Sequence, residues 1–275
     1  MPFYKTYDPA PSMKGLIRDY QVYHINWNEG GILPNPFITC LANTEQNLYF
    51  LIHSPMKIVP NSNVEIPVPP VVVTGPKSKP VGLLFGKNHL MVKVAFQPTG
   101  TYRLLGINMN KTVNNGVDAK TIWGDDVINL LNQLRESPSY DSMVEMVNSF
   151  IDAKYDRNCR PEEPIDKVAV EMLNPLNNNS MQEWASDACL SLRQFERSFI
   201  ERVGISPKLF TRIVRFEHAM LIKNQCANKS WSDIVQECGY TDSSHLLKEF
   251  KQFAEFPPSQ FYATQTSGFS QLSTG

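Results

Sequence analysis

Two hydrophobic patterns divide the chain. Up to about residue 98, short runs of β-branched and aromatic residues are separated by turn residues, with prolines at the run boundaries. This pattern is typical of antiparallel strands, because proline is tolerated only where a strand needs no ladder donor. The clearest predicted strands cover residues 48–53, 71–74, 81–85 and 90–96. The pattern therefore predicts an antiparallel β barrel or sandwich within residues 1–118.

Helical spacing replaces the strand pattern from residue 124 onward. One apolar stripe starts at Val127 and a second starts at Met143, after a break at Pro138. The two stripes predict a helical hairpin within residues 119–157. Its apolar faces would pack either on the sheet or on another copy of the chain. Packing on another copy would make the hairpin a dimerisation element. Two prolines within residues 158–164 indicate a linker to the last segment, 158–275.

The last segment contains an internal near-repeat. Core-type residues recur 51 positions later as the pairs Phe195 and Leu246, Phe199 and Phe250, and Pro207 and Pro258. The first copy contains two pairs with the spacing of capping boxes, Ser180 with Glu183 and Ser191 with Gln194. In the second copy Gly239 supplies a turn and Asp242 a helix cap. A short helix, a tight turn and a longer helix define a helix-turn-helix unit, predicted at about 180–203 and again at about 231–254.

A further helix is expected between the two units. Ser206 as cap and Pro207 at the first helical position begin it, and its apolar stripe continues to about Asn224. Such a helix would be roughly 27 Å long at 1.5 Å per residue. This length approaches the roughly 34 Å between successive major-groove faces of B-DNA. One chain is therefore expected to place two recognition helices in adjacent grooves.

Local charge adds to this picture, although the whole chain is nearly neutral, with 26 basic and 27 acidic residues. Between Ser191 and Arg215 there are six cations and two anions, and an excess of cations is the footprint of a DNA-binding surface. In the second copy, hydroxyl groups, a histidine and one lysine open the longer helix. The candidate DNA-binding residues are Arg193, Gln194, Glu196, Arg197, Arg212, Ser243, Ser244, His245 and Lys248. We expect the first unit to dominate affinity, because charged contacts are stronger than neutral ones.

These residues resemble the AraC/XylS class of transcription regulators. The strings SLRQFERSFIERVGISPKLFTRIVRFEHAM and IVQECGYTDSSHLLKEFKQFAEFPPSQFY carry the resemblance, which covers about residues 165–263. It implies a domain of two helix-turn-helix units joined by a central helix, with the exposed positions of both longer helices reaching bases. One position departs from the family pattern: Glu255 stands where glycine is usual, whereas the first copy keeps Gly204. A left-handed Glu255 would strain the second unit.

The N-terminal part is similar to a sensor-type domain attached to such modules, through the strings GPKSKP, VAFQPTGTYRLLGI and TIWGDD. This resemblance implies a small, cupin-like β barrel without naming an effector. Tyr23, Trp27, Tyr49 and Phe85 are either pocket-lining aromatics or core residues. Arg215 and Glu217 are either an ion-pairing set or include a phosphate contact. The expected fold class is therefore α+β, with a β domain, a helical hairpin and an all-α DNA-binding domain.

Composition removes several function classes. Five scattered cysteines without a CxxC pair indicate neither a disulfide framework nor a zinc site, and favour a reducing cytoplasm. Five histidines show no HxH or HExxH arrangement, and no nucleophile elbow or P-loop is present. The N-terminus has no apolar signal region, and the most apolar stretch is too short to span a bilayer. We expect no cofactor, no metal, no membrane partner and no enzymatic activity.

Two functions remain open at this point. The first is a cytoplasmic, sequence-specific transcription regulator that binds double-stranded DNA, with a small-molecule effector and a homodimer as further candidate partners. The second is a barrel enzyme or binding protein with a nonspecific DNA-binding tail. The first function predicts that some duplex sequences are bound far more tightly than others, and the second predicts uniform affinity.

Overall fold

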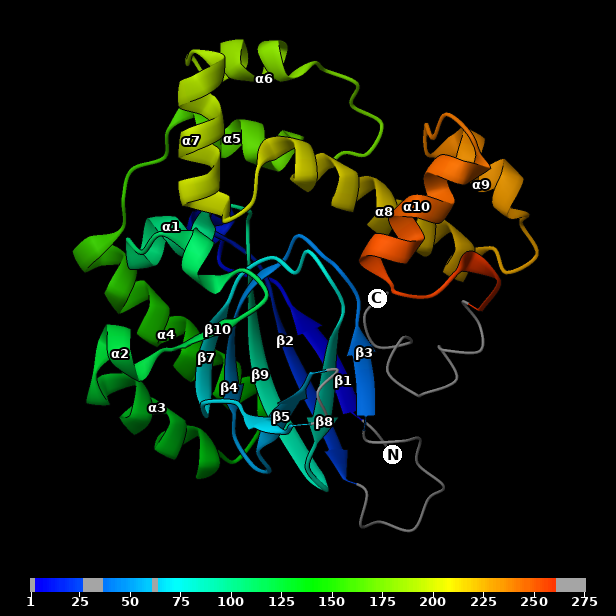
Figure 1. The fold of residues 1–275 in the computed structure, drawn as a ribbon. Helices are drawn as coiled ribbons and strands as arrows, with labels where there is room; N and C mark the ends of the chain where they lie inside the picture. The colour runs from blue at the N-terminus through cyan, green and yellow to red at the C-terminus, as the bar shows by residue number, and fades with distance from the viewer. Residues whose placement is uncertain (1–2, 27–36, 61–63, 261–275) are drawn as a thin grey trace.

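The computed structural model describes residues 3–26, 37–60 and 64–260. Trp27, and the end of the second family-like string beyond residue 260, lie outside the described residues. Figure 1 shows a β-sheet region with helices along one side and a helical module across one end. Among the described residues, no helix combines the length and the apolar composition that crossing a bilayer requires.

The N-terminal part contains two antiparallel sheets. A six-stranded sheet has the order β1-β2-β9-β4-β7-β10, and a four-stranded sheet has the order β3-β8-β5-β6. The strands are β1 (Phe3–Tyr7), β2 (Ile17–Asn26), β3 (Phe37–Cys40), β4 (Gln46–Leu51), β5 (Met56–Val59), β6 (Ile66–Pro67), β7 (Val71–Thr74), β8 (Val81–Phe85), β9 (Asn88–Phe96) and β10 (Gly116–Asp118). Within the described residues the sheets stay separate, so the sandwich, not the closed barrel, is the form present.

The four strands with the clearest sequence pattern are confirmed as β4, β7, β8 and β9. The long strand β9 lies at the centre of the larger sheet, where it pairs with β2 on one side and β4 on the other. Its side chains are buried on both faces almost throughout. Burial on both faces explains why its sequence does not alternate and is mostly apolar, with His89 and Lys93 as its buried polar residues.

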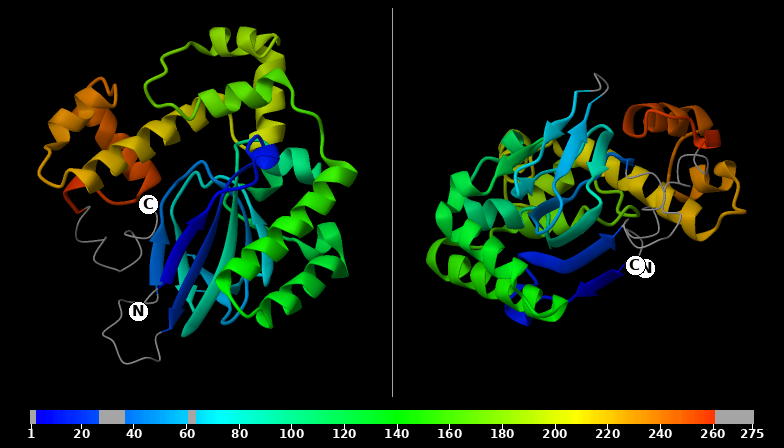
Figure 2. Two further views of the ribbon diagram at one scale, coloured as in Figure 1. Left: turned by 180° about the vertical axis from the view of Figure 1, so that it is seen from behind. Right: turned by 90° about the horizontal axis from the view of Figure 1, so that it is seen from below.

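Short helices and turns connect the sheets to the predicted hairpin. These are η1 (Pro11–Met13), α1 (Gly100–Leu105), η2 (Met109–Thr112) and α2 (Lys120–Trp123). The hairpin itself consists of α3 (Asp125–Arg135) and α4 (Tyr140–Asn158), as its apolar stripes predicted. Val127 and Leu131 of α3, with Val147 and Ile151 of α4, share one core with the six-stranded sheet. The hairpin therefore packs on the sheet, along the side seen in Figure 2.

The remaining helices form the C-terminal module. They are α5 (Pro164–Glu171), α6 (Met181–Asp187), α7 (Leu192–Val203), α8 (Pro207–Gln225), α9 (Trp231–Glu237), α10 (Ser243–Phe253) and the short η3 (Pro258–Gln260). They surround a core of their own, with buried aromatic residues from α7, α8 and α10. One residue of the N-terminal part, Ala42, also belongs to this core. In Figure 1, α8 runs from the first helix pair to the second.

Candidate nucleic-acid interface

The first helix-turn-helix unit is formed by α6 and α7. Both predicted capping boxes are present: Ser180 caps α6 with Glu183, and Ser191 caps α7 with Gln194. The turn between the helices places Cys189 at a φ of 56°, in the left-handed region. Cys189 corresponds to Gly239 of the second copy, so the turn keeps its backbone shape without glycine. The sequence offered no signal for this conformation, because cysteine rarely adopts it.

The longer helix α7 separates a buried face from an exposed one. Phe195 and Phe199 are 0% exposed and pack in the core, while Arg193, Glu196 and Arg197 are exposed. The first turn of a recognition helix is the part that enters a groove, and guanidinium groups match guanine edges and phosphates. Gln194 is also exposed, but its Oε1 accepts hydrogen bonds from the Ser191 backbone and hydroxyl, at 3.1 and 2.7 Å. Its first role is therefore to fix the start of the helix.

The predicted local charge excess is smaller than the sequence count. Arg202 is buried, and its guanidinium bonds Asp166 at 2.9 Å and Glu163 at 2.6 Å. Both acids belong to the start of α5, outside the interval counted from the sequence. Because Arg202 is neutralised inside the protein, it adds no cation to a DNA-facing surface.

The second unit is formed by α9 and α10. Gly239 has a φ of 66° in the turn, and the Asp242 carboxylate accepts a bond from the His245 backbone at 2.8 Å. Ser243, Ser244 and Lys248 are exposed on α10. The predicted turn and cap are present, and three of the four predicted donors are exposed. The first two turns of α10 carry one lysine, Lys248, where α7 carries Arg193 and Arg197.

Two of the predicted contact residues point toward a buried acid instead of outward. Glu249 is 1% exposed and bonds Arg212 Nε at 2.9 Å and the Tyr240 hydroxyl at 2.9 Å. The His245 Nε2 lies 3.6 Å from the same carboxylate, and its ring meets Tyr240 edge to face. Arg212 also bonds Gln252 at 2.7 Å. The structure therefore places Arg212 and His245 in the contact between α8 and α10.

The residue at the end of each unit shows the predicted departure. Gly204 after α7 has a φ of 105°, and Glu255 after α10 has a φ of 63°. Glutamate in this region is strained, because its Cβ approaches the backbone. The second unit thus carries the strain that its sequence indicated.

The helix α8 has 19 residues, which at 1.5 Å per residue is about 28 Å. Ser206 caps it and Pro207 is its first residue, as expected. Arg215 and Glu217 form no ion pair with each other among the described residues. Instead, Arg215 lies over the Tyr240 ring at 5.5 Å, and Glu217 faces the N-terminal part.

Residues 42–46, which we term the docking segment, join the N-terminal part to three helices of the C-terminal module, α7, α8 and α10. The Ala42 amide donates to the Phe253 carbonyl at the end of α10, at 3.0 Å. The Thr44 hydroxyl donates to Glu217 of α8 at 2.9 Å. The Gln46 amide donates to the carbonyls of Arg202 and Val203 at the end of α7, both at 3.2 Å. No sequence pattern indicates this segment, because its contacts are long-range and follow no period.

A partly buried charge network includes Glu45 of the docking segment. The Glu45 carboxylate bonds Lys93 and Arg18, both at 2.8 Å. Burial alone would raise the pKa of Glu45, but Lys93 and Arg18 hold it below its usual value. For Glu217, removal from water and the charge of Glu45 raise the pKa to about 7, against the opposing bonds from Thr44. Glu217 therefore titrates near neutrality at the boundary between the two parts.

The aromatic residues expected in the β domain lie between the sheets. Tyr23 and Phe85 are 6% and 8% exposed and form a small core with Met91. Tyr49 packs against this cluster. Of the two sequence interpretations, core packing is the one that the described residues show.

Comparisons with known proteins agree with this geometry. Residues 184–264 match a family model described as a helix-turn-helix domain. A Haemophilus influenzae protein described as an uncharacterized HTH-type transcriptional regulator is 32% identical over 87 residues, which is 32% of this chain and 29% of that protein. The aligned region thus spans less than a third of that relative's length.

Two solved structures are similar over most of the chain. ToxT from Vibrio cholerae is 13% identical, with 96% of this chain and 98% of its own covered and a TM-score of 0.44. The AraC-like transcriptional activator CuxR is 11% identical, with 80% and 95% covered and a TM-score of 0.28. The C-terminal part of this chain is a helix-turn-helix domain, and the matched residues cover the described units from Trp184 in α6 onward.

Proposed function

We propose that this protein is a sequence-specific DNA-binding transcription regulator of the AraC type, acting in the cytoplasm. The observation that carries the proposal is the matched pair of capped helix-turn-helix units, each with an exposed longer helix, at the two ends of one linking helix. A linking helix of about 28 Å is close to the roughly 34 Å groove repeat of B-DNA. Exposed arginines on α7 supply the phosphate and guanine contacts that such binding needs.

Selection of duplex fragments by the purified full chain tests this proposal. A regulator enriches a common motif, and binds it orders of magnitude more tightly than random duplex at the same salt concentration. The enzyme or binding protein with a nonspecific tail predicts uniform affinity that falls steeply with salt for every sequence. Enrichment of no motif would reject the proposed function.

The docking segment supports a regulatory role for the N-terminal part. Because it bonds the ends of both recognition helices and the middle of α8, a change in the β domain would alter how the two units are held. A small-molecule effector bound in that domain would act through this contact. Its test compares the affinity of the full chain with that of Gln46→Ala, which removes both bonds to α7. The proposal requires a change in affinity for the selected fragment.

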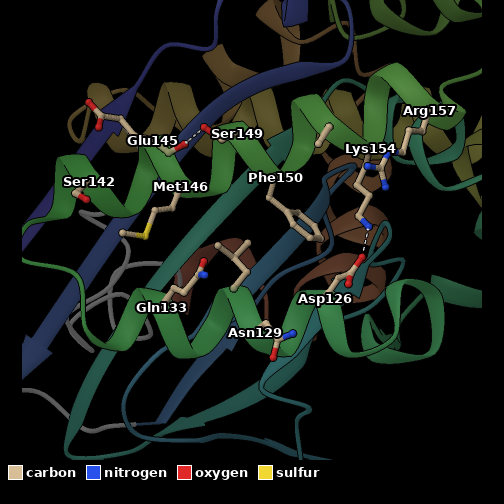
Figure 3. Close-up of a pocket in the computed structure, with 12 residues that line it drawn as sticks. Asp126, Asn129, Gln133, Ser142, Glu145, Met146, Ser149, Phe150, Lys154 and Arg157 are labelled. Atoms are coloured by element: carbon tan, nitrogen blue, oxygen red, sulfur yellow. Dashed lines mark hydrogen bonds and ion pairs between the residues drawn. The ribbon is translucent and has the colours of Figure 1, made fainter.

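We also propose that the chain forms a homodimer through the groove between α3 and α4. This groove has a volume of about 670 Å³. In Figure 3, Phe150 and Met146 reach from α4 toward α3. Along α4, Glu145 lies toward one end and Arg157 toward the other, while Lys154 already bonds Asp126 of α3 at 2.8 Å. Two copies related by a two-fold axis would pair opposite charges across an apolar centre. A second copy is therefore the occupant whose charges fit.

Sedimentation of the full chain tests the dimer. Ala153 lines the groove and is exposed, so Ala153→Glu places a charge in the contact while leaving the helix intact. We expect wild type to dimerise and Ala153→Glu to sediment as a monomer, with Ile66→Glu on the distant strand β6 as the matched control. A wild-type chain that remains monomeric at all concentrations would reject this contact.

A further inference from the structure

The two recognition helices can be compared residue by residue, because their buried positions coincide. Phe195 and Leu246 are 0% and 2% exposed, and Phe199 and Phe250 are both 0% exposed. These pairs are 51 residues apart and set the rotation of each helix about its axis. Outer positions 51 residues apart therefore face the groove in the same way. By this register Glu196 of α7 matches Leu247 of α10, and Arg197 matches Lys248.

Leu247 is an unusual residue for such a position. Its side chain is 48% exposed, and it joins none of the hydrophobic clusters formed by the described residues. It is the fifth residue of α10, on the same exposed side as Ser243, Ser244 and Lys248. Sequence reasoning passed over it, because a leucine in an amphipathic helix is normally assigned to the core. In this helix the core positions are already taken by Leu246 and Phe250.

The chemistry of the major groove distinguishes the two matched residues. Leucine has no donor or acceptor, and the one apolar group that a base displays in that groove is the C5 methyl of thymine. An ionised glutamate only accepts, and the donors displayed there are the amino groups of cytosine and adenine, of which cytosine is the usual glutamate partner. The same helical position therefore favours a different base in each unit.

We propose that Leu247 recognises the methyl group of a thymine, and that Glu196 at the matching position of the first unit accepts a hydrogen bond from the amino group of a cytosine. This inference rests on the proposed DNA-binding function and adds a base preference to it. It predicts an asymmetric binding site, with two half-sites that differ at the base pair contacted by the fifth residue of each helix.

Substitution of single thymines by deoxyuridine in the selected fragment tests the Leu247 contact, because the substitution removes only the methyl group. At one thymine in the half-site of the second unit, we expect wild-type affinity to fall about fourfold, the equivalent of ~0.8 kcal/mol for one buried methylene-sized group. Leu247→Ala should bind the thymine and deoxyuridine fragments equally. Ile66→Ala, which shortens an exposed apolar residue of the β domain, should retain the fourfold difference.

A protein-facing role for Leu247 would give a different result. Leu247→Ala would then weaken binding by the same factor on both fragments, and no deoxyuridine position would depend on Leu247. That result overturns the inference while leaving the proposed function intact. Enrichment of no motif by the wild-type chain would reject the function and this inference together.

The Glu196 contact is tested by repeating the fragment selection with Glu196→Gln. Glutamine pairs best with adenine in the major groove. We therefore expect one position in the half-site of the first unit to change from cytosine to adenine, with the second half-site unchanged. An unchanged base preference at every position would contradict the assignment of Glu196.

Discussion

The two helix-turn-helix units have left-handed residues at equivalent positions but place glycine at opposite ends of the recognition helix. In the first unit, Cys189 adopts the left-handed turn and Gly204 ends the helix. In the second, Gly239 makes the turn and Glu255 ends the helix. The fold thus has a left-handed residue at both positions of each unit. Glycine, which adopts this conformation without strain, occupies only one of the two positions in each unit.

The reason for this difference lies in the surroundings of each glycine. A Cβ added at Gly204 would lie 2.8 Å from the Met109 carbonyl of η2, whereas one added at Gly239 would meet nothing within 4 Å. The first unit is held against the N-terminal part by a close backbone contact. The second is attached mainly through α8 and the Ala42 amide. We infer that the first unit is the anchored reader and the second the more independent one.

The largest expected effect comes from Gly204→Ala. The added Cβ must displace backbone and also occupy a strained φ, so we expect a loss of about 3 kcal/mol in the free energy of unfolding. Gly239→Ala is the matched control, because only its backbone conformation is unfavourable; we expect about 1 kcal/mol. Urea denaturation measures both. Equal losses would contradict the anchoring of the first unit.

The next effect concerns the α7 face. Arg193→Ala and Arg197→Ala should each weaken binding to the selected fragment by about 1 to 3 kcal/mol, because each removes a charged contact to a base edge or phosphate. Both side chains are exposed, so thermal unfolding should remain unchanged. Wild-type affinity in both variants would exclude α7 as a reader.

The Glu217 contact should make the docked arrangement pH-dependent. Because its folded pKa of about 7 lies above the unfolded value, the folded state binds the extra proton between about pH 4.5 and pH 7. Stability from this group is therefore highest in acid and is lost as the pH rises through 7. We expect Glu217→Gln to abolish a difference of about 1 to 2 kcal/mol between pH 5.5 and pH 8. An identical pH profile for variant and wild type would refute this role.

The smallest effect is a gain in stability from relieving strain. Glu255→Gly and Cys189→Gly should each raise the free energy of unfolding by about 0.5 to 1 kcal/mol. Each substitution removes backbone strain from the folded state, and the greater entropy of glycine in the unfolded chain offsets part of that gain. Thermal unfolding measures the gain. A loss of stability in either variant would mean that its side chain makes a contact that outweighs the strain.

Local signals predicted most of the C-terminal module. The caps at Ser180, Ser191 and Ser206 bond the helix starts that their spacing indicated. The 51-residue register also placed the buried faces correctly, because each helix must bury one apolar stripe. These features depend on residues three or four positions apart, which a sequence displays directly.

The features that the sequence could not predict depend on partners far along the chain. Arg202 was counted as a surface cation, yet it pairs with Asp166, 36 residues away. Arg212 and His245 face Glu249, whose burial follows from the packing of α10 on α8. The docking segment likewise joins Gln46 to the end of α7, 156 residues away. No period or motif encodes such contacts.

A comparison of two double variants tests the central claim most directly. The first double variant combines Arg193→Ala with Arg197→Ala on α7. The second combines Ser244→Ala with Lys248→Ala, at the matched positions of α10. Footprinting both on one selected fragment gives the affinity and the protected length. We predict the greater loss of affinity from the first pair, since it removes two charged contacts and the second pair removes only one, and charged contacts are roughly twice as strong as neutral ones. From the second pair we predict a footprint shortened to one groove. A greater loss from the second pair would contradict this account and make α10 the principal reader.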